Sequence, residues 1–251
     1  MNEINWNEVK FRASSWGNLL SEPQSKADKE AGRLGVTCQK ELLKIYTQEK
    51  YGRKKDITTA CMDKGKIVEA NSIELFSLVE GVIYFKNEEP LENEWFTGHP
   101  DIFTGRDIKN ADEVSDIKSS WELDSFMPKL LEKPDKGYVA QLNVYYSLTG
   151  AQGGSIAYCL VDCPMEVLEG EKRKLLYAMN VISEESPEYK RAAAELERIL
   201  TFPDIDYRER VIKKAVPRDE ALIEEMKSKV PTFRQWLADF ERNHLSLYPK
   251  Q

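Results

Sequence analysis

The chain has 251 residues, of which 41% are hydrophobic and 31% are charged. This composition is typical of a soluble globular enzyme with one large domain, and it excludes disordered and fibrous proteins. The formal net charge is −7 at pH 7, which argues against a protein that holds nucleic acid by bulk electrostatics. An enzyme with a local basic groove, or with carboxylates gathered around a metal ion, stays consistent with this charge.

No apolar run approaches the roughly 18 residues that cross a membrane, and the polar, acidic start MNEINWNEVKF is no signal peptide. We therefore expect a cytoplasmic protein without a membrane partner. In that compartment the cysteines are expected to be reduced thiols, and their spacing predicts no iron–sulfur cluster. The cysteines are Cys38, Cys61, Cys159 and Cys163.

Apolar periodicity, β-branched runs and glycine or proline stops divide the chain into helices and strands. In chain order, the predicted elements are helices at 38–50 and 62–79, strands at 81–87, 94–105 and 113–121, a helix at 136–150, a strand at 155–161, and helices at 187–200, 218–229 and 232–243. The three consecutive strands predict an antiparallel meander. The whole order predicts an α/β fold of the α+β kind, in which a mixed sheet is flanked by helices.

Two acids and a lysine lie on consecutive predicted strands. Asp101 follows Pro100, and Asp116-Ile117-Lys118 belongs to the next strand. Asp116 and Lys118 are two residues apart, so their side chains point to the same face of a strand. Carboxylates are preferred ligands of a hard divalent cation, and the backbone carbonyl of Ile117 is a further neutral ligand. The pattern therefore predicts a metal site with a lysine beside it.

The same spacing of acid and lysine occurs elsewhere in the chain. The closest rival is Asp107-Ile108-Lys109, which follows Asp101 within a few residues. This rival falls in a polar stretch that is suited to a hairpin loop. Asp116 instead opens a segment in which polar and apolar residues alternate, as they do in a strand. The sequence therefore favours the copy that begins at Asp116.

Two polar residues on the flanking helices complete the set. Glu69 lies on the predicted helix before the meander, and Gln141 lies on the helix after it, with Tyr145 one turn further on. Each of these residues alone would be an ordinary surface residue. The ordered series of glutamate, Pro-Asp, Asp-x-Lys and glutamine rarely arises by chance.

This ordered set resembles the PD-(D/E)XK nuclease superfamily, and the local sequence is similar to its phage lambda-type, YqaJ-like alkaline exonuclease branch. The similar segments are GKIVEANSIELF, GHPDIFTG, VSDIKSS, YVAQLNVYYSL and the entry segment RASSWGNLL. The resemblance implies a single nuclease domain over residues 1–251. Within it, a restriction-endonuclease-like core would cover about residues 10–162, and a helical C-terminal extension would cover about residues 163–251.

The resemblance implies hydrolysis of DNA phosphodiester bonds with Mg²⁺, for which Mn²⁺ substitutes. The implied metal ligands are Asp101, Asp116, the Ile117 carbonyl and, directly or through water, Glu69. Lys118 would orient or deprotonate the attacking water, or stabilise the developing negative charge. Gln141 would position the lysine or a phosphate. The sequence departs from many members of the superfamily at Asp116, where they have glutamate.

The resemblance also implies DNA contacts, each of which has a plainer alternative. Ser14 and Ser15 would help to hold a DNA end, or cap the following turn. Trp121 would stack on an end base, or cover the edge of the sheet. Tyr145 would contact DNA, or pack in the core. The branch commonly carries an arginine several residues before the serine that corresponds to Ser14, and this sequence has none at that position. Arg12 would take its place.

The function that the resemblance implies is a metal-dependent exonuclease that digests linear double-stranded DNA for phage-type recombination. It implies a phage-infected or prophage-carrying bacterial host, a single-strand annealing protein as partner, and a homo-oligomer such as a trimer. Three alternatives stay open. They are a RecB-like single-strand nuclease or an endonuclease of the same superfamily, a catalytically inactive relative that only binds DNA, and a metal protein that binds a small phosphate ester.

Overall fold

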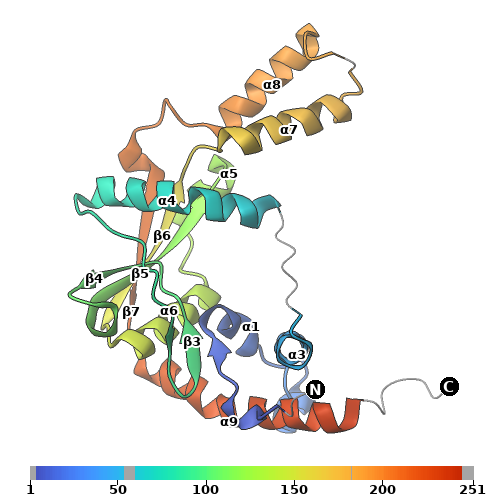
Figure 1. Ribbon diagram of the computed structural model, residues 1–251, viewed down its shortest axis with the longest axis vertical. Coiled ribbons are helices and arrows are strands. Elements are labelled where there is room, and N and C mark those ends of the chain that lie inside the picture. Colours follow the sequence, from blue (N-terminus) through green and yellow to red (C-terminus); the bar gives the residue numbers. More distant parts are fainter. Residues whose placement is uncertain (1–3, 54–59, 182, 245–251) are drawn as a thin grey trace, which may run out of the picture.

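The computed structural model describes residues 4–53, 60–181 and 183–244 of the chain (Figure 1). Its helices are α1 (Trp16–Leu19), α2 (Lys26–Glu30), α3 (Val36–Tyr51), α4 (Ala60–Glu80), α5 (Leu123–Phe126), α6 (Lys136–Thr149), α7 (Met165–Ala178), α8 (Pro187–Leu200) and α9 (Glu220–Asn243). Its strands are β1 (Phe11–Arg12), β2 (Leu91–Glu92), β3 (Phe96–Gly98), β4 (Ile102–Gly105), β5 (Ala111–Ser120), β6 (Gly153–Leu160) and β7 (Val211–Pro217). The predicted α/β class is confirmed. Among the described residues, no helix is both long enough and apolar enough to cross a membrane.

The main sheet has four strands in the order β4-β5-β6-β7. β5 pairs antiparallel with β4 and parallel with β6. The two parallel strands are joined through α6, because parallel neighbours need a crossover connection. The α4 and α6 helices cover opposite faces of this sheet (Figure 1). β5 is therefore an interior strand that is covered on both sides.

Residues of β5 alternate between these two layers, as the sequence predicts. Val114 packs into the main core with α6, whereas Ile117 packs with residues of α4. Asp116 lies on the side of α6. Ser119 lies on the side of α4, where its Oγ atom is 2.8 Å from Oγ of Ser72. The alternation thus separates the polar residues of one short strand between two different layers.

The predicted antiparallel meander is wrong in two places. Residues 81–87 form no strand, and the side chains of Ile83 and Phe85 are 78% and 79% exposed instead of lying on a sheet. Residues 94–105 divide between two sheets, because β3 pairs with β1 and β2 while β4 pairs with β5. Pro100 lies between β3 and β4 and has no N–H group for a ladder, so a single strand is interrupted there.

The C-terminal part of the chain, predicted as a helical extension, also contributes a strand to the main sheet. β7 pairs antiparallel with β6. α9 runs unbroken through Pro231, where the sequence predicts two separate helices. Proline removes one hydrogen bond of a helix, but Val230 and Phe233 on either side are buried in the main core. This apolar burial stabilises the continuous helix.

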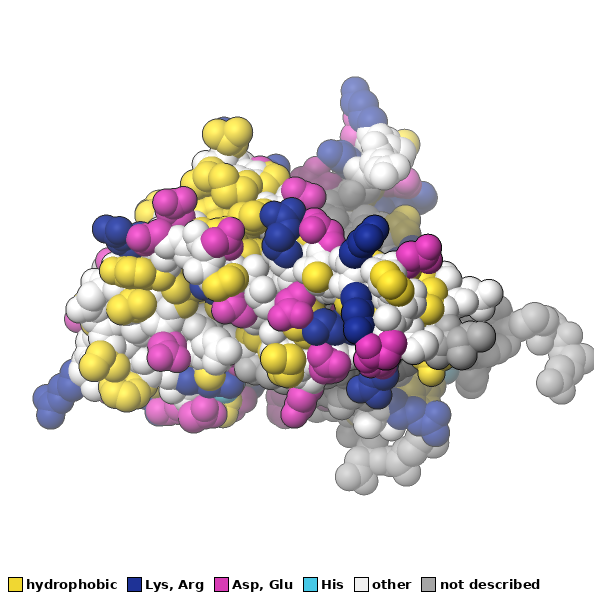
Figure 2. All heavy atoms as spheres, turned by 90° about the horizontal axis from the view of Figure 1, so that it is seen from above, with side chains coloured by type: hydrophobic (Ala, Val, Ile, Leu, Met, Phe, Trp, Pro, Cys, Tyr) yellow, Lys and Arg dark blue, Asp and Glu magenta, His cyan; other side chains and the backbone are white. Residues whose placement is uncertain are grey.

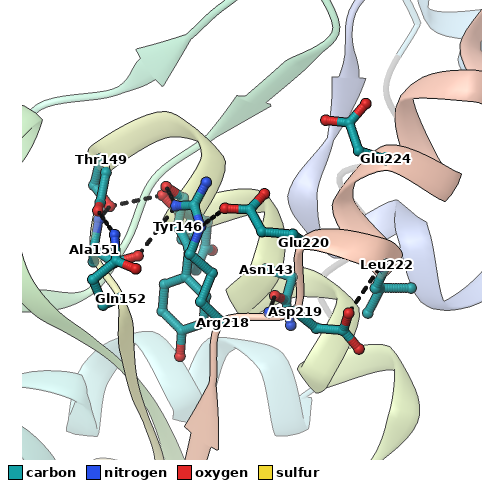
Figure 3. Close-up of polar contacts among 12 residues, drawn as sticks. Asn143, Tyr146, Thr149, Ala151, Gln152, Arg218, Asp219, Glu220, Leu222 and Glu224 are labelled. Carbon is teal, nitrogen blue, oxygen red and sulfur yellow. Dashed lines mark hydrogen bonds and ion pairs between the residues drawn. The ribbon is translucent and has the colours of Figure 1, made fainter.

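Arg218, between β7 and α9, ties this part of the chain to α6 (Figure 3). Its Nη1 atom donates hydrogen bonds to the carbonyl oxygens of Tyr146, at 2.7 Å, and of Ala151, at 3.2 Å. The backbone N–H of Asp219 donates to Oδ1 of Asn143 at 2.7 Å. A guanidinium group at the carbonyl end of a helix also interacts favourably with the helix dipole. These contacts hold α6 against α9.

We expect Arg218→Ala to lower the free energy of unfolding by about 1–3 kcal/mol, because two part-buried carbonyl groups lose a charged donor. The side chain of Arg218 is 17% exposed. Arg208 is the control, because its side chain is 70% exposed and pairs with Asp206, so that Arg208→Ala is expected to cost less than about 1 kcal/mol. Urea unfolding followed by circular dichroism measures both values. Equal losses would contradict the role assigned to Arg218.

A hairpin of α7 and α8 projects from the rest of the molecule (Figure 1). Leu168 and Leu200 are buried together with Cys163 where the hairpin meets the main body. The hydroxyl group of Tyr189 donates a hydrogen bond to the carbonyl oxygen of Lys172 at 3.1 Å and joins the two helices. The hairpin lies between β6 and β7 in the chain, so it is an excursion from the main sheet.

Candidate active site

Asp116 and Lys118 lie next to each other on β5, with Gln141 of α6 above them. The side chain of Asp116 is buried, and its Oδ2 atom is 2.7 Å from Nζ of Lys118. Its Oδ1 atom accepts a hydrogen bond from Nε2 of Gln141 at 3.1 Å. The structure thus brings together three residues that the sequence places on two different elements.

Asp101 precedes β4 and faces the same segment of β5. Its Oδ2 atom accepts a hydrogen bond from the backbone N–H of Ile117 at 2.7 Å. Burial, together with the negative charges of Asp116 and Glu69, raises the pKa of Asp101 to about 7. Burial also raises the pKa of Asp116. Two neighbouring buried acids that are difficult to ionise indicate a position where an added positive charge is favourable.

Lys118 is held as a cation in this environment. Burial by itself lowers the pKa of Lys118, but the carboxylates of Asp116 and Asp101 outweigh it and raise that pKa above its usual value. The Nζ atom also lies 4.6 Å from the centre of the Tyr138 ring, which is a cation–π contact. Sequence reasoning missed Tyr138. Its spacing of three residues from Gln141 on one helix is the signal that could have revealed it.

Glu69 comes to the site from α4 and is paired with a lysine that sequence reasoning missed. Its Oε2 atom is 2.9 Å from Nζ of Lys86. Lys86 is held there by the next residue, since the N–H of Asn87 donates to the carbonyl oxygen of Asp101 at 2.7 Å. The side-chain Nδ2 of Asn87 donates to the carbonyl oxygen of Pro100 at 3.1 Å. The local pattern predicts a strand at this segment and offers no reason to place Lys86 at the site.

The donor set at this site fits a hard divalent cation. Asp101 and Asp116 offer carboxylate oxygens, and the backbone of Ile117, which follows Asp116 on β5, is hydrogen-bonded to Asp101. Within the described residues, the buried Oδ2 atom of Asp116 makes no hydrogen bond of good geometry, although it is ion-paired with Lys118. Across that same part of the chain, no three acidic, histidine or cysteine side chains are grouped tightly enough to bind a metal. The predicted ligand Glu69 is ion-paired with Lys86 in this structure.

A groove of about 740 Å³ opens beside these residues. Gln141 and Tyr145 line it from α6, and Arg12, Ser14 and Ser15 line it from the N-terminal segment. Four of the five side chains that the sequence predicts as DNA contacts therefore face one groove that reaches the candidate site. Ser15 stands at the start of α1, but its side chain makes no capping hydrogen bond, so the alternative of an ordinary N-cap is not supported.

The groove carries charges of both signs. Lys10 and Lys44 line it and are paired with Glu92 and Glu41 at 2.7 Å and 2.8 Å. Arg12 is exposed in the groove, and its side chain forms no hydrogen bond or ion pair with another described residue. Lysine and arginine side chains also alternate with acidic ones over the described part of the face in Figure 2. Arg12 is therefore the cation of the groove that is best placed to meet an anionic ligand.

Tyr145 supports Gln141 from within the protein. It is 4% exposed, and its hydroxyl oxygen accepts a hydrogen bond from Nε2 of Gln141 at 2.8 Å. A Cβ atom on Gly98 would come within 2.8 Å of the tyrosine ring, so a side chain at Gly98 would displace it. This arrangement favours core packing, the alternative that the sequence left open for Tyr145. A DNA contact by this residue stays a prediction.

Trp121 and the rival loop have structural roles. Trp121 is half-buried against the apolar cluster of α4 and against that of α7 and α8, which favours the alternative that it covers the sheet. Asp107 accepts a hydrogen bond from the backbone N–H of Lys109 at 3.0 Å. Lys109 pairs with Glu89 at 2.7 Å. The second copy of Asp-Ile-Lys thus closes a surface loop.

The structure is similar to solved structures of exonucleases. A phage-related exonuclease from Haemophilus somnus 129PT aligns with a TM-score of 0.72 and 25% identity over 94% of this chain and 97% of that chain. The alkaline exonuclease LHK-Exo from Laribacter hongkongensis aligns with a TM-score of 0.60 and 15% identity over 97% and 98% of the two chains. LHK-Exo in complex with dAMP aligns with a TM-score of 0.57 and 16% identity over 95% of each chain.

The chain matches no protein-family model and no curated protein at a significant level. The similarity in structure nevertheless extends over nearly the whole chain, and it includes the C-terminal part that the sequence resemblance leaves out. The chain therefore has a fold similar to that of phage-related and alkaline exonucleases, which is consistent with the alkaline exonuclease branch of the PD-(D/E)XK nuclease superfamily.

Proposed function

We propose that the chain is a metal-dependent deoxyribonuclease that digests linear double-stranded DNA from its ends, and that it acts as a single nuclease domain. One observation carries this proposal. The carboxylates of the half-buried Asp101 and the buried Asp116, with Lys118 beside them, lie next to a groove lined by Arg12 and Ser14. The similarity to two exonucleases along nearly their whole length supports the reaction class.

In the proposed mechanism, Asp101, Asp116 and the Ile117 carbonyl would hold Mg²⁺, and Glu69 would complete the site directly or through water. When bound, the cation polarises the phosphoryl oxygen and lowers the pKa of an attacking water, and Mn²⁺ supplies the same chemistry. Lys118 stabilises the negative charge that develops on the phosphate, or orients the water. Gln141 keeps the Asp116 carboxylate in one orientation through its hydrogen bond.

The groove supports recognition of a DNA end. Arg12 offers a guanidinium group, whose planar set of donors suits a phosphate. Ser14 and Ser15 offer hydroxyl groups on the same side of the groove. Because the chain is acidic overall, we propose that it binds DNA through these few contacts. Few phosphate contacts predict that the affinity for DNA depends only weakly on salt concentration.

The biological role that we propose is resection of DNA ends for phage-type recombination. It rests on the resemblance in sequence and on the similarity to a phage-related exonuclease. Such an enzyme leaves a single strand that an annealing protein binds, so a single-strand annealing protein is the proposed partner. A homo-oligomer, such as a ring of three copies, is proposed on the resemblance alone.

The test compares a linear duplex, a covalently closed circle of the same sequence and a single strand, each incubated in Mg²⁺ and in excess chelator. We expect the linear duplex to be digested in Mg²⁺, the closed circle to resist, and chelator to stop the reaction. Release of nucleotides measured over time gives the three rates. Asp116→Asn serves as the control for contaminating nucleases.

The same experiment separates the alternatives. Equal digestion of linear and circular duplex would identify an endonuclease, and faster digestion of the single strand would identify a RecB-like enzyme. Binding of DNA without digestion in any metal would identify an inactive relative. Undiminished digestion in chelator, with metal shown to be absent, would remove the metal mechanism.

A further inference from the structure

Lys86 is a charged residue beside the candidate site, and the proposed mechanism assigns it no role. Its side chain is 42% exposed, and its Nζ atom is 2.9 Å from Oε2 of Glu69. Its place is set by Asn87, which is 6% exposed and is hydrogen-bonded to the backbone of Pro100 and Asp101. The lysine is therefore partly exposed beside Glu69, on a segment that is hydrogen-bonded to the backbone of Asp101.

The ammonium group of Lys86 is paired with Glu69, and it occupies the position that a metal cation bound by Glu69 would take. The ammonium and a divalent cation both bind carboxylate oxygen, so the two compete for one side chain. In the structure Glu69 is paired with this lysine, and among the described residues it forms no three-acid group with Asp101 and Asp116.

The net charge of the site indicates a second partner for Lys86. When all groups are ionised, the three carboxylates of Glu69, Asp101 and Asp116 face the two ammonium groups of Lys86 and Lys118, which leaves one net negative charge. A divalent cation changes this to one net positive charge. A phosphodiester carries one negative charge, so the cation-loaded site is neutralised by one DNA phosphate. Lys86, without its carboxylate partner, is then free to contact that anion.

We propose that Lys86 alternates between two partners: it pairs with Glu69 until a divalent cation takes that carboxylate, and it then binds a DNA phosphate next to the scissile bond. The inference rests on the proposed function, because it requires that the chain binds a divalent cation and DNA. It adds a residue for which the sequence resemblance gives no role.

The first test is the affinity for Mn²⁺ alone, measured by isothermal titration calorimetry on the full chain without DNA. Lys86→Gln is expected to bind Mn²⁺ about fivefold more tightly, because the competing ammonium is gone. In a Glu69→Gln background, the same change is expected to have no effect on the affinity. Lys109→Gln is the matched control, since Lys109 is ion-paired with Glu89 at 2.7 Å and, among the described residues, not with Glu69, Asp101 or Asp116. This variant should bind Mn²⁺ as the unchanged protein does.

The second test is binding of a short duplex with phosphorothioate ends, which resist cleavage, at several salt concentrations. With Ca²⁺ present, Lys86→Gln is expected to weaken binding several-fold and to reduce the slope of log affinity against log salt by about 1. Without a divalent cation, Lys86 is engaged by Glu69 and the slope should be the same for both proteins. Lys109→Gln should keep the full slope in Ca²⁺.

Two results would overturn the inference while leaving the proposed function intact. One is a Lys86→Gln protein that binds Mn²⁺ with unchanged or weaker affinity, and the other is a salt slope in Ca²⁺ equal to that of Lys109→Gln. Failure of the unchanged protein to bind Mn²⁺ is a different result, because it removes the metal-dependent function and this inference together.

Discussion

Asp116→Asn and Lys118→Ala are each expected to reduce the kcat for DNA cleavage by about 10²–10⁴-fold. Asp116 is buried and is a proposed metal ligand, so the neutral amide removes one of the two carboxylate charges that attract the cation. Lys118 is the proposed group that stabilises charge on the phosphate, and alanine leaves that charge without its partner. Single-turnover cleavage of a linear duplex in saturating Mg²⁺ measures both effects.

The second Asp-Ile-Lys copy provides a matched control on the same hairpin. Asp107→Ala and Lys109→Ala are expected to keep kcat within about twofold. Loss of the Asp107 cap costs only about 0.5–2 kcal/mol of stability, and Lys109 forms a surface ion pair. Circular dichroism and thermal unfolding of all four proteins show whether each is folded. If the loop pair proved essential and the strand pair dispensable, the assignment of the site would be wrong.

The stability of the metal-free protein is expected to fall as pH rises from about 4 to about 7. Asp101 contributes to this fall, and the raised pKa of Asp116 acts in the same direction. The pKa of Asp101 is raised to about 7 in the folded state from the ordinary value of 3.8. Between these values the folded state binds more protons than the unfolded state, so the free energy of unfolding decreases with pH. The penalty is absent below the unfolded-state pKa and complete above pH 7. Asp101→Asn is expected to reduce this fall and to raise the melting temperature of the metal-free protein at pH 8 by several degrees.

Thermal unfolding in chelator at pH values from 4 to 8.5 tests this expectation. Asp112→Asn, a change at an exposed residue of the same sheet, is the control and should leave the pH dependence as it is. Excess Mg²⁺ should reduce the fall in the unchanged protein, because a cation bound by Asp101 favours the ionised carboxylate. The Asp101→Asn protein should be inactive in DNA cleavage although it is more stable than the unchanged protein. An Asp101→Asn protein with the full pH dependence would show that another group produces it.

Several features of the site could be predicted from local sequence. Gly150 adopts a left-handed conformation and ends α6, as its position after an apolar helix predicts. The alternation in β5 correctly assigns Asp116 and Lys118 to one face of a strand. Gln141 and Tyr145 meet because residues four apart on a helix are neighbours. These features depend on periods of two and 3.6 residues, which any short segment of sequence already contains.

The sequence by itself determined the α/β class and the order of most elements, and it predicted Asp101, Asp116, Lys118 and Gln141 as one set, which the structure brings together. Only the tertiary structure decided that β3 and β4 belong to different sheets and that Lys86 stands beside Glu69. It also decided that β7 joins the main sheet and that α9 continues through Pro231. The physical reason is the same in each case. Residues far away in the chain decide which strands pair, whether a helix stays buried on both sides of a proline, and which distant segments form an ion pair. Local sequence patterns do not contain this information.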